Sequence, residues 1–181
     1  LVLGAGGGVG ITAVEIGKIM GAEVIAAASS ENKLAAAKRA GADHLINYSE
    51  GNIREKIKNI VGSSGIDVLY DPVGGELFEP CLRSLAWGGR ALVIGFASGT
   101  IPKLPTNLTL VKGCSVVGVF WGAFRIKETE EDNKNFEILF KWFKEKKVSP
   151  LVSQKFSLEN AKEALLTLAT RKAIGKVIIT P

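Results

Sequence analysis

The sequence is poor in the residues that form disulfide bonds or bind structural metal ions. It contains only two cysteines, Cys81 and Cys114, and neither has a partner at C-x-x-C spacing, so neither a disulfide framework nor a zinc site is predicted. No apolar run approaches the roughly 18 residues of a membrane span, and no basic segment precedes the first apolar residues. These absences favour a cytoplasmic protein that binds no metal, and they leave a mitochondrial location open.

A concentrated block of one charge is also missing. The net charge is +5, but the lysines are scattered among glutamates along the expected helices instead of forming one basic run. Solvated helix faces explain this pattern better than a nucleic-acid surface. The lone histidine, His44, stands beside an expected strand and is interpreted as a surface residue, not a catalytic base.

Apolar runs and helical patterns alternate along almost the whole chain, and the 21 glycines gather at the ends of the apolar runs. This alternation is typical of βα units on a parallel sheet, and it predicts a doubly wound, Rossmann-type α/β fold. Strands are expected at 1–3, 23–28, 44–47, 66–70, 90–94 and 114–120. Helices are expected after the first glycines and at 31–39, 53–61, before 86 and at 129–147, and a loop that holds Pro102 and Pro105 is expected before the sixth strand. From residue 148 the pattern changes to a strand at 151–156, a helix capped by Ser157 that runs to about 170, and a strand at 176–180.

The run Ala5-Gly6-Gly7-Gly8-Val9-Gly10 follows the first short strand and opens an amphipathic helix. It is a variant of G-x-G-x-x-G with alanine first, and its position at the start of a βαβ unit is the context that such a motif requires. Ala5 takes the tight turn, Gly7 lets the pyrophosphate approach backbone N–H groups, and Gly10 packs helix against strand. We predict that this loop, including Gly8 and Val9, binds a dinucleotide.

The end of the second strand indicates which dinucleotide. Sites that prefer NAD place an acid there, about 20 residues beyond the glycines, to hold the ribose 2′-hydroxyl. Here Ser29 and Ser30 follow Ala28, and Lys33 is close; hydroxyls and a lysine suit a 2′-phosphate and predict NADPH. Alternatives remain open: Ser30 as a simple N-cap, Lys33 as a solvated residue, and Glu31 as a ribose ligand.

Five ordered segments then carry a family resemblance: GAGGGVG, SSENK, AGADHLINY, DPVGG and GGRALVIGFASG. These segments resemble the zinc-independent medium-chain dehydrogenases/reductases of the NADPH:quinone oxidoreductase, zeta-crystallin-like family, and the resemblance covers essentially the whole chain in order. The resemblance implies an NADPH-dependent oxidoreductase that transfers hydride to a quinone or an α,β-unsaturated carbonyl, and no bound metal.

The same resemblance implies roles for particular residues. Lys33 and Tyr48 match the lysine and tyrosine that hold the 2′-phosphate in that family. The other positions expected along the cofactor bridge and the nicotinamide are Val73, Gly74, Gly95, Phe96, Ala97, Phe120 and Trp121. For the last two, ordinary packing at a domain boundary is an equal alternative. No catalytic residue is carried over.

The resemblance also implies an architecture. Residues 1–147 match the Rossmann domain, and residues 148–181 match a return into a GroES-like catalytic domain that is mostly absent, so we expect the chain alone to be inactive. The strand at 114–120 is expected at the sheet edge, where in the family it pairs with its copy to form a homodimer. Two alternatives remain: an enoyl reductase unit of a multidomain synthase, and a non-catalytic NADPH- or RNA-binding crystallin-like module.

Overall fold

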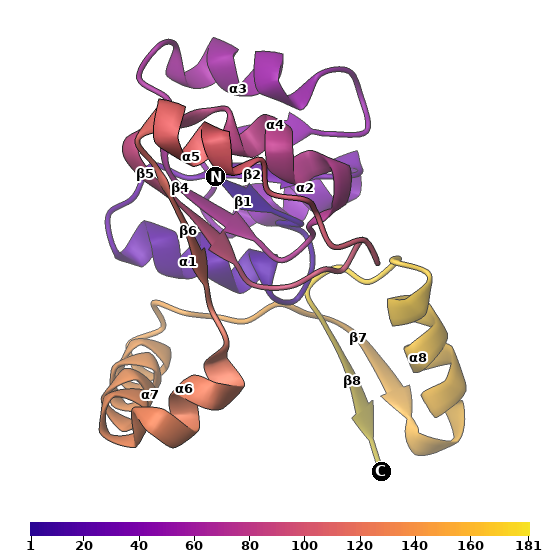
Figure 1. The fold of residues 1–181 in the computed structure, drawn as a ribbon. Coiled ribbons are helices and arrows are strands. Elements are labelled where there is room, and N and C mark those ends of the chain that lie inside the picture. Colours follow the sequence, from indigo (N-terminus) through magenta and orange to yellow (C-terminus); the bar gives the residue numbers. More distant parts are fainter.

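The computed structural model describes all residues, 1–181, and shows a six-stranded sheet covered by helices together with a separate two-stranded sheet (Figure 1). The large sheet has the order β3-β2-β1-β4-β5-β6, and every strand pair in it is parallel. This is the strand order of the doubly wound dinucleotide-binding fold, so the predicted fold class is confirmed. Its strands are β1 Val2–Leu3, β2 Ile25–Ala28, β3 His44–Asn47, β4 Ile66–Asp71, β5 Leu85–Val93 and β6 Ser115–Gly118.

Helices lie on both faces of this sheet. The helices of the chain are α1 Gly10–Ile19, α2 Glu31–Arg39, α3 Ile53–Val61, α4 Phe78–Leu82, α5 Thr106–Lys112, α6 Trp121–Lys127, α7 Thr129–Lys144 and α8 Ala161–Ala169. Short 3₁₀ turns at Gly75–Leu77 and Leu158–Asn160 precede α4 and α8. Helices α3, α4 and α5 supply side chains to one apolar cluster, and α1 and α2 supply them to the other.

The two apolar clusters follow from the alternation of side chains along the strands. Leu3 and Ala27 point into the cluster beneath α3, α4 and α5, whereas their neighbours Val2 and Ala26 point toward α1 and α2, as the two-residue period of a strand requires. Phe78 of α4 is fully enclosed in the first cluster. Both faces of the central strands are therefore buried, and the ends of the strands are left to carry polar loops.

Several predicted boundaries were wrong. The helix expected to reach residue 86 ends at Leu82, and β5 begins at Leu85 instead of 90, with a register irregularity opposite β4 where two glycines interrupt the strand. The expected loop around Pro102 and Pro105 contains α5, because a proline just before a helix leaves the helical hydrogen bonds intact. The strand expected at 114–120 covers only Ser115–Gly118, since the chain turns into the unpredicted helix α6.

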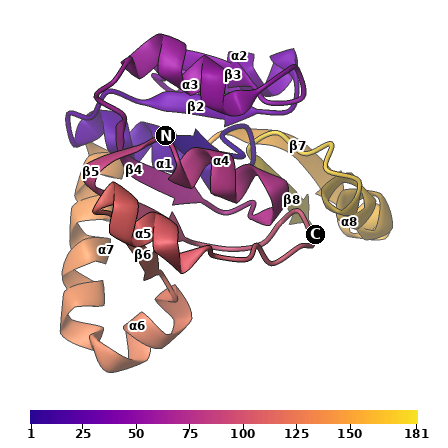
Figure 2. The same ribbon diagram turned by 45° about the horizontal axis from the view of Figure 1, so that its top comes forward.

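The C-terminal residues form a unit of their own. Strands β7, Val152–Ser157, and β8, Lys176–Thr180, pair in parallel, and α8 packs on both of them. Figures 1 and 2 show this unit on one side of the large sheet and the α6–α7 hairpin on another. The predicted strand-helix-strand pattern is present, although Ser157, expected as a helix cap, makes no capping hydrogen bond with its side chain. None of the helices combines the length and apolar character needed to cross a bilayer.

Candidate cofactor-binding site

The glycine loop, residues 4–10, lies at the carboxyl end of β1 and turns sharply into α1. Gly7 N donates to Gly4 O over 2.9 Å, which closes the turn. A Cβ on Gly10 would overlap the carbonyl of Gly4, so only glycine lets the helix begin this close to the strand. The N–H groups of Gly8 and Val9 have no protein acceptor, and they stand at a helix N-terminus where anions are stabilised.

Two further glycines of the loop make room for other segments. A Cβ on Gly6 would overlap the side-chain stem of Lys33. A Cβ on Gly8 would lie 3.0 Å from the carbonyl oxygen of Gly175 and 3.2 Å from Lys176 Nζ. The glycine run therefore does more than leave room for a ligand. It also lets a lysine from α2 and the C-terminal segment approach the same turn.

A polar cluster forms where β2 and β3 end. Lys33 Nζ donates to Ser29 Oγ over 3.3 Å and to the carbonyl of Arg171 over 2.8 Å. Tyr48 is held beside them by its N–H, which donates to Ala28 O over 3.1 Å, and burial raises the pKa of its phenol above the usual value, although a hydrogen bond with Ser29 opposes this. The structure therefore brings together Ser29, Lys33 and Tyr48, which were predicted to share one site.

The structure bears on the alternative roles of two neighbours of this cluster, Ser30 and Glu31. Ser30 occupies the N-cap position of α2, but its side chain makes no capping hydrogen bond, so the N-cap alternative for this hydroxyl has no support. The carboxylate of Glu31 accepts from Asn47 Nδ2 over 3.2 Å. Glu31 is therefore already bonded to β3, which weakens the alternative that it holds a ribose.

Arg171 belongs to this cluster and was missed by sequence reasoning. It lies between α8 and β8 with a left-handed backbone, φ 57°, and its Nη2 donates to Ser98 O over 2.9 Å. Partial burial, and then the charge of Arg171, lower the pKa of Lys33. No local motif marks Arg171, because its neighbours in space come from positions 33 and 98 of the sequence.

Residues 171–176, here called the C-terminal strap, run along the glycine loop. Gly175 N donates to Gly6 O over 2.8 Å, and Gly7 and Gly175 form a parallel bridge. Lys176 donates from its side chain to no protein group, and its ammonium stands over Gly8. The strap therefore closes one side of the glycine loop and places the ammonium group of Lys176 beside it.

The opposite side is built by the loops that follow β4 and β5. Ala97 N donates to Pro72 O over 3.0 Å, and Ser98 N donates to Val73 O over 2.9 Å. Gly74 has φ 66°, and a Cβ there would lie 3.0 Å from the ring of Phe96. The structure thus brings together the predicted residues of both loops, namely Val73, Gly74, Gly95, Phe96 and Ala97.

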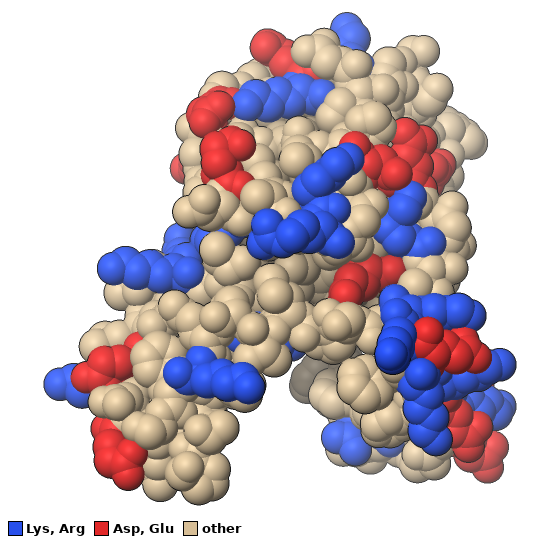
Figure 3. Space-filling view, turned by 180° about the vertical axis from the view of Figure 1, so that it is seen from behind, with Lys and Arg blue, Asp and Glu red and all other residues tan.

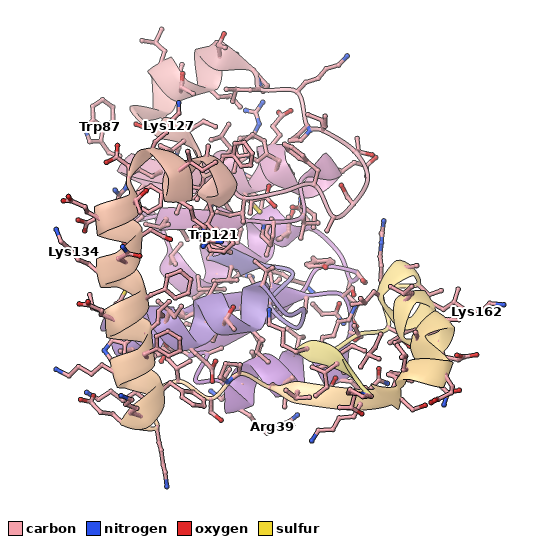
Figure 4. All side chains as sticks on the ribbon, turned by 90° about the horizontal axis from the view of Figure 1, so that it is seen from below. Arg39, Trp87, Trp121, Lys127, Lys134 and Lys162 are labelled. Atoms are coloured by element: carbon pink, nitrogen blue, oxygen red, sulfur yellow. The ribbon has the colours of Figure 1, made fainter.

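The two aromatic residues after β6 make no hydrogen bond with these loops, although Val119 N, just before them, donates to Val93 O at the end of β5. Trp121 Nε1 donates to the buried carboxylate of Asp132 over 3.0 Å, its ring lies 6.5 Å from that of Phe136, and Arg125 covers it at 5.0 Å (Figure 4). Phe120 is 78% exposed. These contacts of Trp121 match the packing alternative, inside the α6–α7 hairpin, and its contact with a cofactor stays a prediction.

The arrangement can hold an extended, anionic dinucleotide. It offers free N–H groups at a helix start, a basic cluster at one end and paired backbone loops at the other, at the carboxyl ends of the strands where ligands of such sheets bind. No group of three or more His, Cys, Asp or Glu side chains could hold a metal ion. Fold and site together define a nicotinamide-dinucleotide-binding domain.

Comparison with known proteins supports the same class, a nicotinamide-dinucleotide-binding domain. Residues 8–143 match the family model described as "Zinc-binding dehydrogenase". A "Quinone oxidoreductase-like protein 2" of Bos taurus is 38% identical over 99% of this chain and 52% of its own length, and an "NAD-dependent alcohol dehydrogenase" of Saccharolobus solfataricus is 32% identical over 100% and 50%. A solved Escherichia coli quinone oxidoreductase, complexed with NADPH, superposes with a TM-score of 0.85 at 29% identity, covering 99% of this chain and 56% of that one.

The chain belongs to this dehydrogenase family, and within it to the quinone oxidoreductase-like medium-chain reductases, as the ordered motifs predicted. It corresponds to their C-terminal, cofactor-binding part. The chain spans about half the length of the curated relatives that it matches, from 49 to 52% for the quinone oxidoreductase-like proteins. The activity and substrates of the whole protein are therefore taken up as proposals.

Proposed function

We propose that this chain binds NADPH and orients its nicotinamide for hydride transfer to a quinone or an α,β-unsaturated carbonyl in the whole protein. The observation that carries the choice of cofactor is the cluster of Ser29, Lys33, Tyr48 and Arg171 beside the glycine loop. Two cations and two hydroxyls suit a dianionic 2′-phosphate. A ribose 2′-hydroxyl is held by an acidic side chain instead, and the nearby carboxylate of Glu31 already accepts from Asn47.

We assign the pyrophosphate to the glycine loop and the nicotinamide to the loop after β5. The pyrophosphate meets the free N–H groups of Gly8 and Val9, with Lys176 adding positive charge beside the same turn. The nicotinamide lies along Gly95, Phe96 and Ala97. A bound NADPH supplies the hydride, and the protein binds, orients and shields it from water. Few titratable groups line the loops, which suits a reaction whose chemistry belongs to the cofactor.

The cofactor assignment is tested by replacing Lys33 with methionine, which keeps the stem on Gly6 and removes the charge. Because a hydrogen bond to a charged group contributes about 1.5–3 kcal/mol, the Kd for NADPH should rise roughly 10- to 100-fold, while the Kd for NADH stays nearly constant. Tyr48→Phe should act in the same direction. Both constants are measured by nicotinamide fluorescence on titration.

The matched control is Lys38→Met, which removes a lysine from the last turn of the same helix. It should leave both affinities as they are in the parent chain. The assignment fails if Lys33→Met leaves the ratio of the NADPH and NADH affinities unchanged.

We propose that residues 148–181 are the return segment of a GroES-like catalytic domain, and that residues 1–147 form the cofactor domain. The support is the separation of β7 and β8 from the large sheet, because an isolated two-stranded sheet is marginally stable and usually joins further strands. Several leucines of this unit are exposed: Leu158, Leu165, Leu166 and Leu168. The substrate pocket then depends on residues outside this chain, which is why the chain alone should be inactive.

A homodimer through β6 is proposed as well. This strand forms one edge of the large sheet, and Val117 is exposed on it. Three apolar side chains beside its start are also exposed: Trp87, Leu110 and Val111. The ring of Trp87 lies over Gly113, directly before β6, and projects from the body of the molecule (Figure 4). An unpaired edge with apolar neighbours favours pairing with a second copy.

Val117→Lys should convert this dimer to a monomer, because two like charges would meet at the paired edges. Sedimentation velocity at micromolar concentration measures the change. Leu45→Lys is the control, since Leu45 lies on β3 at the opposite edge and has similar exposure. A parent chain that sediments as a monomer contradicts the proposal.

The RNA-binding alternative gains no specific observation. On the face drawn in Figure 3, basic and acidic side chains are interspersed over the large sheet unit and both projecting units. A continuous basic surface is the usual electrostatic footprint of nucleic-acid binding.

A further inference from the structure

Asp71, the last residue of β4, is one of two buried carboxylates in the chain. The other, Asp132, is paired with Trp121 and Arg125. Asp71 is 2% exposed and has no cationic partner; instead its Oδ1 accepts the N–H groups of Val73 and Gly74, both over 2.8 Å. Burying a carboxyl is costly unless it is hydrogen-bonded, and these two backbone hydrogen bonds offset part of that cost while they join the carboxyl to the turn.

The carboxylate determines where the neighbouring carbonyl groups point. With the N–H groups of Val73 and Gly74 turned inward, the carbonyls of Pro72 and Val73 face the loop after β5 and accept Ala97 N and Ser98 N. The backbone oxygen of Asp71 itself accepts Ile94 N over 2.9 Å. One residue thus joins the loop after β4 to the loop after β5 along several consecutive positions.

This junction also reaches the glycine loop. A Cβ on Gly4 would lie 3.0 Å from Val73 Cγ2, so the turn held by Asp71 packs against the start of that loop. Phe96 N, in the middle of the joined segment, donates to no protein acceptor. The joined loops therefore present one free backbone donor, the N–H group of Phe96, and the turn at 71–74 fixes its position.

We propose that Asp71 is a positioning residue for the nicotinamide half of the cofactor. Its carboxylate holds the turn after β4, and that turn fixes the segment 94–98 on which the nicotinamide lies. The inference rests on the proposed function. It predicts a defect that falls mainly on one half of the cofactor, because Lys33 and Tyr48, which hold the adenosine half, make no hydrogen bond with segment 94–98.

The test compares NADPH with 2′,5′-ADP, which contains the adenosine half and the 2′-phosphate but no nicotinamide. Asp71→Ala should weaken NADPH binding about 10-fold or more and abolish its fluorescence enhancement, because two buried N–H groups lose their acceptor. The affinity for 2′,5′-ADP, measured by isothermal titration calorimetry, should change less than about two-fold. Asp71→Asn, which keeps Oδ1 as an acceptor, should restore most of the NADPH affinity.

Far-UV circular dichroism and urea unfolding report whether each variant is folded. If Asp71→Ala does not fold, Asp71→Ser, which keeps an oxygen one bond shorter, should show the same selective loss of NADPH. Equal loss of both ligands, or unchanged NADPH binding in a folded variant, overturns the positioning role while the proposed function stands. A parent chain that binds neither ligand overturns the proposed function, and this inference with it.

Discussion

Gly10→Ala should lower the free energy of unfolding by about 3 kcal/mol or more and abolish dinucleotide binding, because overpacking here pushes backbone against backbone. The added Cβ would overlap the carbonyl of Gly4 and crowd the Cα of Ala5. A flexible side chain could rotate away from such a contact, but the two ends of this turn cannot separate without moving α1 off the sheet. Urea denaturation and NADPH titration measure the two effects.

Gly118→Ala is the matched control for this substitution. Gly118 lies on β6, has no positive φ, and a Cβ there would meet nothing within 4 Å. Its replacement should leave stability nearly unchanged, apart from a small entropic gain from the stiffer unfolded chain. If Gly10→Ala behaved like Gly118→Ala, the close approach of helix and strand would not be needed, and the reading of Gly10 as a packing glycine would be wrong.

The predictable part of the fold is the part encoded locally. Helices α2 and α3 and strand β3 occur at the predicted residues, because each has a clear apolar period and a glycine or polar residue at its ends. Helix α5 was missed, since Pro102 and Pro105 were interpreted as loop signals although a proline is compatible with a helix that starts just after it. Helix α6 begins only two residues after β6 ends, and Phe120 at its N-cap is not a residue type that signals a helix start.

The candidate site divides in the same way. The glycine loop and the Ser29, Lys33 and Tyr48 group could be predicted, because each follows a strand at a motif position. Arg171 and Lys176 could not, since the residues that they approach, Lys33, Ser98 and Gly8, lie more than 70 residues away in sequence. For Trp121 the sequence left cofactor contact and ordinary packing as equal alternatives, because proximity to the end of β6 said nothing of its contacts with Asp132 and Phe136. Tertiary contacts decide such roles, and a sequence pattern reports only local structure.

The amino group of Leu1 gives a marked pH dependence of stability between pH 6 and 8 for a polypeptide that starts at this residue. It is buried and donates to Val68 O over 2.8 Å, beside the pairing of β1 with β4. Burial lowers its pKa from 8.0 to about 6. The unfolded chain therefore binds more protons between these values, so stability rises with pH from about 6 to 8.

The size of this effect follows from the two pKa values. A difference of about two pKa units corresponds to about 3 kcal/mol, so urea unfolding should show that much gain in stability between pH 5.5 and 8.5. The control carries several residues ahead of Leu1, which converts the amine into a peptide N–H that donates to the same carbonyl of Val68 without a charge. That chain should lose this pH dependence and be the more stable of the two at pH 6. If both chains showed the same profile, the amine would not be buried, and β1 would be frayed at its first residue.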